Sequence, residues 1–109
     1  MLRSFILAVA AVLVVANLAS AQDKVARGQA VYAEQKCGLC HSVAGKGNAK
    51  GPIDDAGSKY TAAELKAWIV DAKGMTVKTK SPRKPEMKNY TLPEADVDAL
   101  VAYMQTLKK

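Results

Sequence analysis

Histidine, cysteine and aromatic residues are scarce in this 109-residue chain, which contains one His, two Cys, one Trp, one Phe and four Tyr. A structural zinc site needs four ligands, commonly in pairs of Cys and His, and this inventory does not supply them. So few aromatic side chains make a thin core, and small domains often need a disulfide, a metal or a cofactor for stability. The sequence therefore indicates that a large apolar part of the core is not made of amino acids.

The long apolar run lies at the N-terminus, where residues 5–16 follow Arg3 and precede an Ala-Ser-Ala sequence that ends at Ala21. A positive start, a short apolar stretch and small residues two apart are typical of a secretory signal peptide. The alternative is an uncleaved membrane anchor, but a run of 12 residues is shorter than the roughly 20 that a spanning helix needs. We expect a signal peptide over residues 1–21 and one domain over residues 22–109, exported to a bacterial periplasm without stable membrane insertion.

The charge balance is basic. The whole chain has a net charge of +6, and residues 22–109 keep 15 basic and 10 acidic side chains, a net charge of +5. A basic excess permits nucleic acid, a membrane surface or an acidic protein as the partner. Because an exported protein seldom meets nucleic acid, we expect acidic proteins as partners. We also expect the chain to be a monomer.

No segment shows the alternation typical of a strand and no internal repeat is present, whereas three segments show helical periodicity. Thr61 and Glu64 form a capping box at the start of the second of these, and Gly74 ends it. Thr91 and Glu94 suggest a similar box before the third. The prediction is an all-α domain with three main helices over residues 23–37, 61–74 and 93–107 and two long loops over residues 42–58 and 75–90.

Two features of this outline need a further explanation. Gly28 lies inside the first helix, where Gly costs about 1 kcal/mol relative to Ala. Close approach of another backbone would explain it, and a tolerated weak spot is the alternative. The loop over residues 42–58 has 17 residues, which is unusual in so small a domain unless the loop wraps around something.

The strongest motif is Cys-x-x-Cys-His at Cys37, Cys40 and His41, which is typical of a c-type haem attachment site. Two cysteines three residues apart can reach the two vinyl groups of one haem, and the next residue can then bind the iron as proximal ligand. A thioredoxin-like redox pair would need a βαβ context, which is absent. A structural disulfide would explain neither the histidine nor the thin core, so we expect one covalently attached haem c.

The second axial ligand of the iron must be a methionine or a lysine, or the position is open, because His41 is the only histidine. Met87 is favoured, since Pro82 and Pro85 stiffen the loop that carries it. Met75 follows the second predicted helix at once and is the alternative, with little slack to cross the haem. Met104 lies on the apolar stripe of the last helix, where we expect it to be core.

These motifs resemble those of the class I cytochromes c, specifically the small bacterial single-haem forms, and the resemblance covers the whole exported domain. The segment that ends in Pro85-Glu86-Met87 resembles the Pro-x-Met ligand segment of that family. Gly28 and Tyr32 in the first helix, with Leu100 and Tyr103 in the last, resemble its helix-crossing signature. The resemblance implies the small all-α cytochrome c fold around one haem, with the glycine allowing the terminal helices to touch.

Two further site residues are implied by the resemblance. Gly51-Pro52 is similar to the turn whose proline carbonyl accepts the Nδ1 proton of the proximal histidine, which orients that ligand. Trp68 would lie near the haem, beside a propionate or on the methionine side, and ordinary core packing is the alternative. The chain departs from the family at Asp54, where relatives commonly have leucine, and we expect Ile53 to take that place.

The function implied is one-electron transfer, without an enzymatic activity of its own. Lys36, Lys46 and the basic loop around Met87 would form a positive rim for acidic redox partners. One alternative is a haem subunit of a larger oxidoreductase. Another is a haem sensor or enzyme with an open iron position, although the absence of a second histidine argues against an efficient peroxidase.

Overall fold

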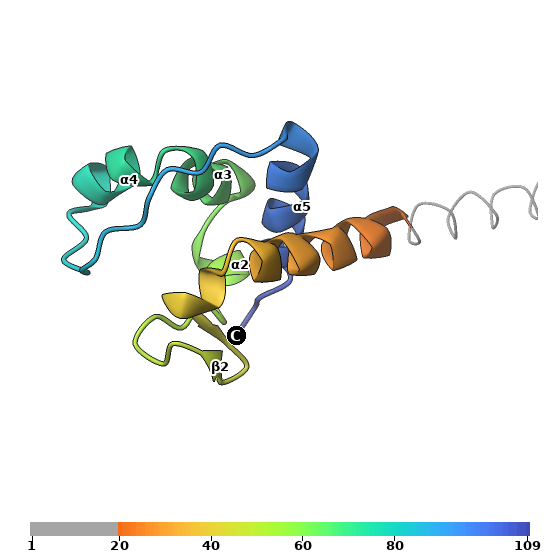
Figure 1. Cartoon of the computed structure of the whole chain (residues 1–109), viewed down its shortest axis with the longest axis horizontal. Helices are drawn as coiled ribbons and strands as arrows, with labels where there is room; N and C mark the ends of the chain where they lie inside the picture. The colour runs from red at the N-terminus through yellow and green to blue at the C-terminus, as the bar shows by residue number, and fades with distance from the viewer. Residues whose placement is uncertain (1–19) are drawn as a thin grey trace, which may run out of the picture.

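A computed structural model describes residues 20–109, and the predicted signal peptide lies outside the described residues except for Ser20 and Ala21 (Figure 1). The described part is mainly helical, which confirms the all-α prediction. No helix in it has the length and apolar character needed to cross a membrane. The elements in order are a helix over residues 20–34, a 3-10 turn η1 (Cys37–Leu39), strands β1 (Ser42–Val43) and β2 (Lys46–Gly47), and helices α2 (Ala56–Lys59), α3 (Ala62–Val70), α4 (Ala72–Thr79) and α5 (Glu94–Gln105).

The first helix and α5 cross in direct contact, and Gly28 lies at the crossing (Figure 1). A Cβ added to Gly28 would lie 2.7 Å from the carbonyl carbon of Ala99 and 2.7 Å from the Cβ of Tyr103, closer than real Cβ atoms approach. Beside this contact the rings of Tyr32 and Tyr103 pack edge to face, with centroids 5.7 Å apart. The explanation of Gly28 by close backbone approach is therefore confirmed.

The apolar core joins four helices. Its buried members come from the first helix, α2, α3 and α5, and they are Val31, Ala56, Leu65, Ile69, Val97, Leu100 and Val101. Partly buried side chains such as Tyr60, Tyr90 and Met104 pack against this cluster. Several core residues, among them Leu65, Ile69 and Leu100, also line the cavity described below.

One of the two predicted capping boxes is present. Thr61 Oγ1 accepts a hydrogen bond from the backbone N–H of Glu64 at 3.2 Å, and the backbone N–H of Thr61 donates to Glu64 Oε1 at 3.0 Å. The box predicted between Thr91 and Glu94 is wrong, because α5 begins after Pro93 without a side-chain cap. Pro93 occupies the capping position, and its side chain has no acceptor to offer.

The prediction that a helix ends at Gly74 and a loop begins at residue 75 is wrong. Gly74 was expected to end a helix, but it lies in the first turn of the next one, where its N–H donates to Asp71 Oδ1 at 3.2 Å. Residues 75–79 are therefore helical instead of belonging to a loop. The predicted loop over residues 42–58 also contains regular structure: β1 and β2 form a two-residue hairpin, and α2 begins at Ala56.

Candidate functional site

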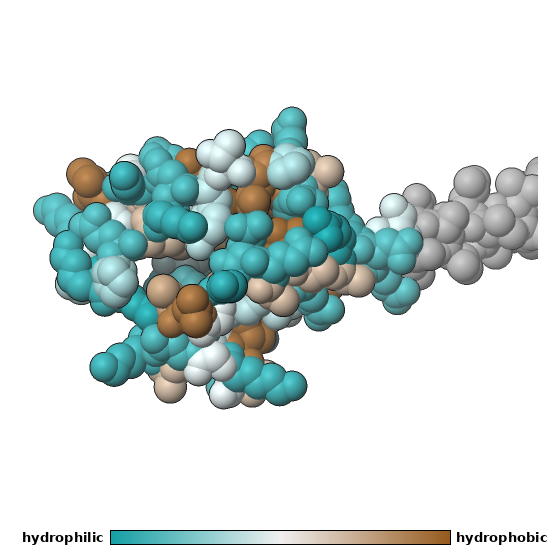
Figure 2. Space-filling view, viewed as in Figure 1, coloured by the Kyte–Doolittle hydropathy of each residue, from teal (hydrophilic) through white to brown (hydrophobic). Residues whose placement is uncertain are grey.

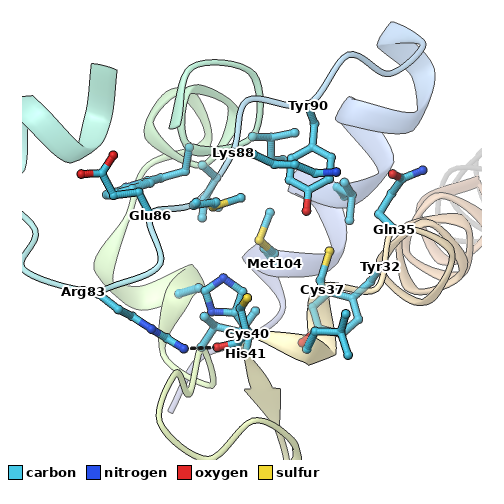
Figure 3. Close-up of a pocket in the computed structure, with 18 of the residues that line it drawn as sticks. Tyr32, Gln35, Cys37, Cys40, His41, Arg83, Glu86, Lys88, Tyr90 and Met104 are labelled. Carbon is cyan, nitrogen blue, oxygen red and sulfur yellow. Dashed lines mark hydrogen bonds between the residues drawn. The ribbon is translucent and has the colours of Figure 1, made fainter. Parts of the chain in front are cut away.

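A cavity of about 530 Å³ opens between the attachment segment, α3, α5 and the loop that precedes α5 (Figure 3). This volume is in the usual range of small-molecule and cofactor sites, about 300–1,000 Å³. Of the residues predicted from the sequence, Cys37, Cys40, His41, Trp68 and Met87 line it. Five of the six predicted site residues therefore meet in one place, although up to 50 positions separate them in the chain.

The attachment segment is wound tightly, which brings its side chains together. The backbone N–H groups of Cys40 and His41 both donate to the carbonyl of Cys37, at 3.1 and 3.0 Å. Both thiols are free, and burial raises the pKa of the Cys37 thiol. This turn presents two thiols and an imidazole to the same cavity, as covalent attachment and proximal ligation require.

The His41 ring points into the cavity, and a hydrogen bond at its Nδ1 fixes the orientation of the ring (Figure 3). Its Nδ1 lies 3.1 Å from the carbonyl oxygen of Gly51. A carbonyl can only accept, so Nδ1 donates and Nε2 keeps its lone pair for a metal. Burial lowers the pKa of His41, and the nearby positive charge of Arg83 lowers it further, so the imidazole is neutral at pH 7, the form that binds metals.

The prediction that Pro52 provides this carbonyl is wrong by one residue. Pro52 is exposed and does not line the cavity. The carbonyl of Gly51 is turned toward β1, where it also accepts a hydrogen bond from the N–H of Ser42 at 3.1 Å, and the carbonyl of Ser42 accepts from Ile53 at 3.0 Å. This short parallel pairing sets the peptide orientation, and it directs the oxygen of residue 51, rather than that of residue 52, toward His41.

Two of the described methionines line the cavity. Met87 comes from the loop before α5, and Met104 comes from α5 itself, with its side chain reaching inward (Figure 3). Met104 also packs against the core, as expected. Met75, the sequence alternative to Met87, is buried within α4 and does not line the cavity.

The far end of the Met87 loop is tied to the α3–α4 junction. Asn89 Oδ1 accepts a hydrogen bond from the N–H of Lys73 at 2.9 Å. The N–H of Tyr90 donates to the carbonyl of Ile69 at 2.9 Å. The bonded residues lie only two and three positions after Met87, so these bonds fix the position from which the Met87 side chain enters the cavity.

Two buried donors in the cavity wall have no protein partner among the described residues. They are the hydroxyl of Tyr32 and the indole Nε1 of Trp68. A buried polar group left unpaired costs about 1–3 kcal/mol, so such groups normally have a partner. Burial raises the pKa of Tyr32 to about 12, which keeps its hydroxyl a donor.

These residues fit a haem c. The wall is mostly aromatic and aliphatic, two thiols stand next to an oriented imidazole, and thioether sulfurs approach from other elements. A haem also carries two propionate groups, which are acceptors of the kind that unpaired Tyr and Trp donors require. Sequence reasoning missed several wall residues, above all Tyr32, Tyr60 and Tyr90. Tyr32 was interpreted only as a contact between the terminal helices, and no motif marks Tyr60 or Tyr90 as part of a site.

Basic side chains surround the mouth of the cavity. Lys36, Arg83 and Lys88 contribute to its lining, and Lys84 forms a 2.8 Å ion pair with Glu86. Figure 2 shows the hollow on this face among mostly hydrophilic side chains. Leu39, between the two cysteines, is 72% exposed, so one apolar side chain is accessible among the basic residues at the cavity.

Comparison with known proteins identifies the same stretch of chain. The family model described as cytochrome c matches residues 25–108. A cytochrome c oxidase subunit 2 from Alkalihalophilus pseudofirmus is 33% identical over 91 residues, which covers 75% of this chain and 25% of that protein. The chain therefore spans about a quarter of the length of this relative. No solved structure matches.

Proposed function

The chain belongs to the cytochrome c family, and from this premise we propose that it is a soluble periplasmic electron carrier with His41 and Met87 as axial ligands. Its cofactor is covalently attached haem c, which supplies a metal that accepts and releases one electron at a time. The observation that carries the proposal is the meeting of Cys37, Cys40, His41 and Met87 in one apolar cavity.

The protein's part in electron transfer is to hold its ligands still. His41 is fixed by its bond to Gly51, and Met87 is fixed by the bonds of the residues that follow it. Ligands that stay in place in both oxidation states keep the reorganisation energy small. A thioether ligand and an apolar wall both favour the ferrous state, so we expect a positive reduction potential.

We expect no enzymatic activity. The chain has a single histidine, and that residue is committed to the iron, so no second imidazole can act as an acid or base on a bound substrate. Export is supported by the features of residues 1–21 described above, and the working domain would be residues 22–109.

The positive rim supports acidic redox proteins as partners. Exposed lysines such as Lys36, Lys46 and Lys88 lie around the cavity or next to the attachment segment. Charge complementarity of this kind steers partners into rapid and weak encounters. Leu39 supplies the apolar contact at the centre of such an interface.

The optical spectrum of the oxidised protein tests the axial ligands. A methionine-ligated ferric haem has a weak long-wavelength sulfur-to-iron band. We expect this band in the parent protein and in the control variants Met104→Leu and Met75→Leu, and its loss in Met87→Ala. Loss in Met104→Leu instead would assign the ligand to α5. A parent that lacks the band and binds carbon monoxide readily would have an open iron position, as in a sensor or enzyme.

The relative named cytochrome c oxidase subunit 2 supports a second candidate, a haem subunit of a larger oxidoreductase. A free carrier and a subunit share the same cavity, so the distinction lies in their association with other chains. Purification of the tagged protein from its source at low salt distinguishes them. Stoichiometric recovery of other subunits would support the second candidate, and recovery of the chain alone would support the carrier.

A further inference from the structure

Arg83 connects two segments that are far apart in the chain. It lies in the loop before α5, four residues ahead of Met87. Its guanidinium donates a hydrogen bond to the backbone carbonyl of Cys40, 43 residues away (Figure 3). Cys40 is an attachment cysteine and directly precedes His41. One side chain thus joins the loop of the proposed sixth ligand to the segment of the proximal ligand.

A second contact places the same guanidinium beside the residue that orients His41. A Cβ added to Gly51 would collide with Arg83 Nη1, so the arginine packs directly on this glycine. Gly51 is buried, and its carbonyl accepts the Nδ1 proton of His41. Arg83 therefore contacts two backbone groups next to His41. One is the carbonyl of Cys40, the residue before His41, and the other is Gly51, whose carbonyl accepts the Nδ1 proton of His41.

The positive charge of Arg83 is not neutralised by a carboxylate within the described part of the chain. The ion pairs there involve Arg27, Lys66 and Lys84, and none involves Arg83. The side chain is half-buried and lines the cavity. A partly buried cation at this wall disfavours an additional positive charge in the cavity. Because the oxidised site has one more positive charge than the reduced site, Arg83 favours reduction.

We propose that Arg83 is a positioning residue that holds the Met87 loop against the proximal segment and raises the reduction potential. The inference rests on the proposed function, because it takes Met87 as the sixth ligand. Asn89 anchors the same loop to α4 on the other side, so Met87 lies between two attachments. Arginine suits the role, since its planar fork can bond a carbonyl and lie on a glycine, which an ammonium group does less well.

Three variants test this inference. Arg83→Gln removes the charge and the fork, and Arg83→Lys keeps the charge only. Lys84→Gln is the matched control, because it removes an exposed charge from the next residue without touching the proximal segment. The readouts on the haem-loaded protein are the reduction potential, the sulfur-to-iron band, and the denaturant concentration at which that band is lost.

We expect Arg83→Gln to shift the equilibrium between the two redox forms roughly fivefold or more toward the oxidised form, and Lys84→Gln to shift it less. Arg83→Lys should keep a potential near that of the parent but lose the band at a lower denaturant concentration. A potential unchanged in Arg83→Gln, or shifted equally in Lys84→Gln, would overturn the proposal. If Arg83→Gln does not assemble with haem, an unchanged denaturation midpoint in Arg83→Lys would overturn it instead.

The proposed function can fail separately from this inference. Absence of the band from the parent, or its survival in Met87→Ala, would refute ligation by Met87. A band that depends on Met87, together with Arg83 variants that behave like the parent, would refute the role of Arg83 alone.

Discussion

Replacing Gly28 by Ala tests whether the crossing of the terminal helices holds the fold together. The new methyl group would meet backbone and Cβ atoms of α5 at 2.7 Å, so the two helices must move apart. Overpacking of this kind costs about 1–3 kcal/mol. Separation also weakens the edge-to-face pair of Tyr32 and Tyr103, worth about 0.5–1.5 kcal/mol beyond its buried area.

One effect opposes these losses. Ala is a better helix former than Gly by about 1 kcal/mol, so the substitution stabilises the first helix itself. The sum is a net destabilisation of about 2 kcal/mol. For a domain of this size, each kcal/mol lowers Tm by about 4–8 °C, so we expect a loss of roughly 10 °C.

The measurements are thermal unfolding, which gives Tm, and guanidinium unfolding, which gives the free energy, both on the haem-loaded protein and followed by far-ultraviolet circular dichroism. Ala30→Gly is the control, because Ala30 is exposed on the same helix and the change should cost only about 1 kcal/mol of helix propensity. Gly28→Ala raises the helix propensity of the first helix and Ala30→Gly lowers it, yet both substitutions should lower the free energy of unfolding. A Gly28→Ala protein at least as stable as the parent would refute the crossing as a tight contact.

Two further predictions concern charge and pH. Raising the ionic strength from about 0.01 M to about 0.15 M shortens the Debye length from about 30 to about 8 Å. Stopped-flow electron transfer with an acidic partner should slow by roughly tenfold or more, and a rate independent of salt would remove the docking role of the lysines. For Tyr32, burial raises the pKa from 10.0 to about 12, so the folded state retains a proton that the unfolded state releases first. Stability present below pH 10 should therefore decline as the pH rises toward 12, and less so in Tyr32→Phe; equal pH slopes of the unfolding free energy would contradict this.

Local chemistry was predictable from the sequence. The spacing of Cys37, Cys40 and His41 is set within one turn of chain, so it needs no knowledge of the rest of the fold. The capping box of Thr61 with Glu64 is equally local. Gly28 could be interpreted because a glycine inside a helix has few explanations, although the sequence did not show that Ala99 is its neighbour.

The error at the Thr91–Glu94 box is local, because Pro93 takes the capping position, but other errors depend on contacts that the sequence does not display. Gly74 resembles a helix stop, but Asp71 caps a new helix at this point and accepts a hydrogen bond from the N–H of Gly74. The choice between the carbonyls of Gly51 and Pro52 depends on pairing with Ser42, a one-residue register that composition does not specify. Nothing near Arg83 in the chain indicates that it reaches Cys40.

The contact between the first helix and α5 has a consequence for how this domain can be joined to other proteins. Residues 21–29 of the first helix share a shallow groove with Thr106, just beyond the end of α5. Neither the start of the first helix nor the residues beyond α5 line the haem cavity. A domain of this form can be fused at either terminus without rerouting its core. Such a domain can serve as one module of a larger protein. A stretch similar to it makes up about a quarter of the cytochrome c oxidase subunit 2 from Alkalihalophilus pseudofirmus.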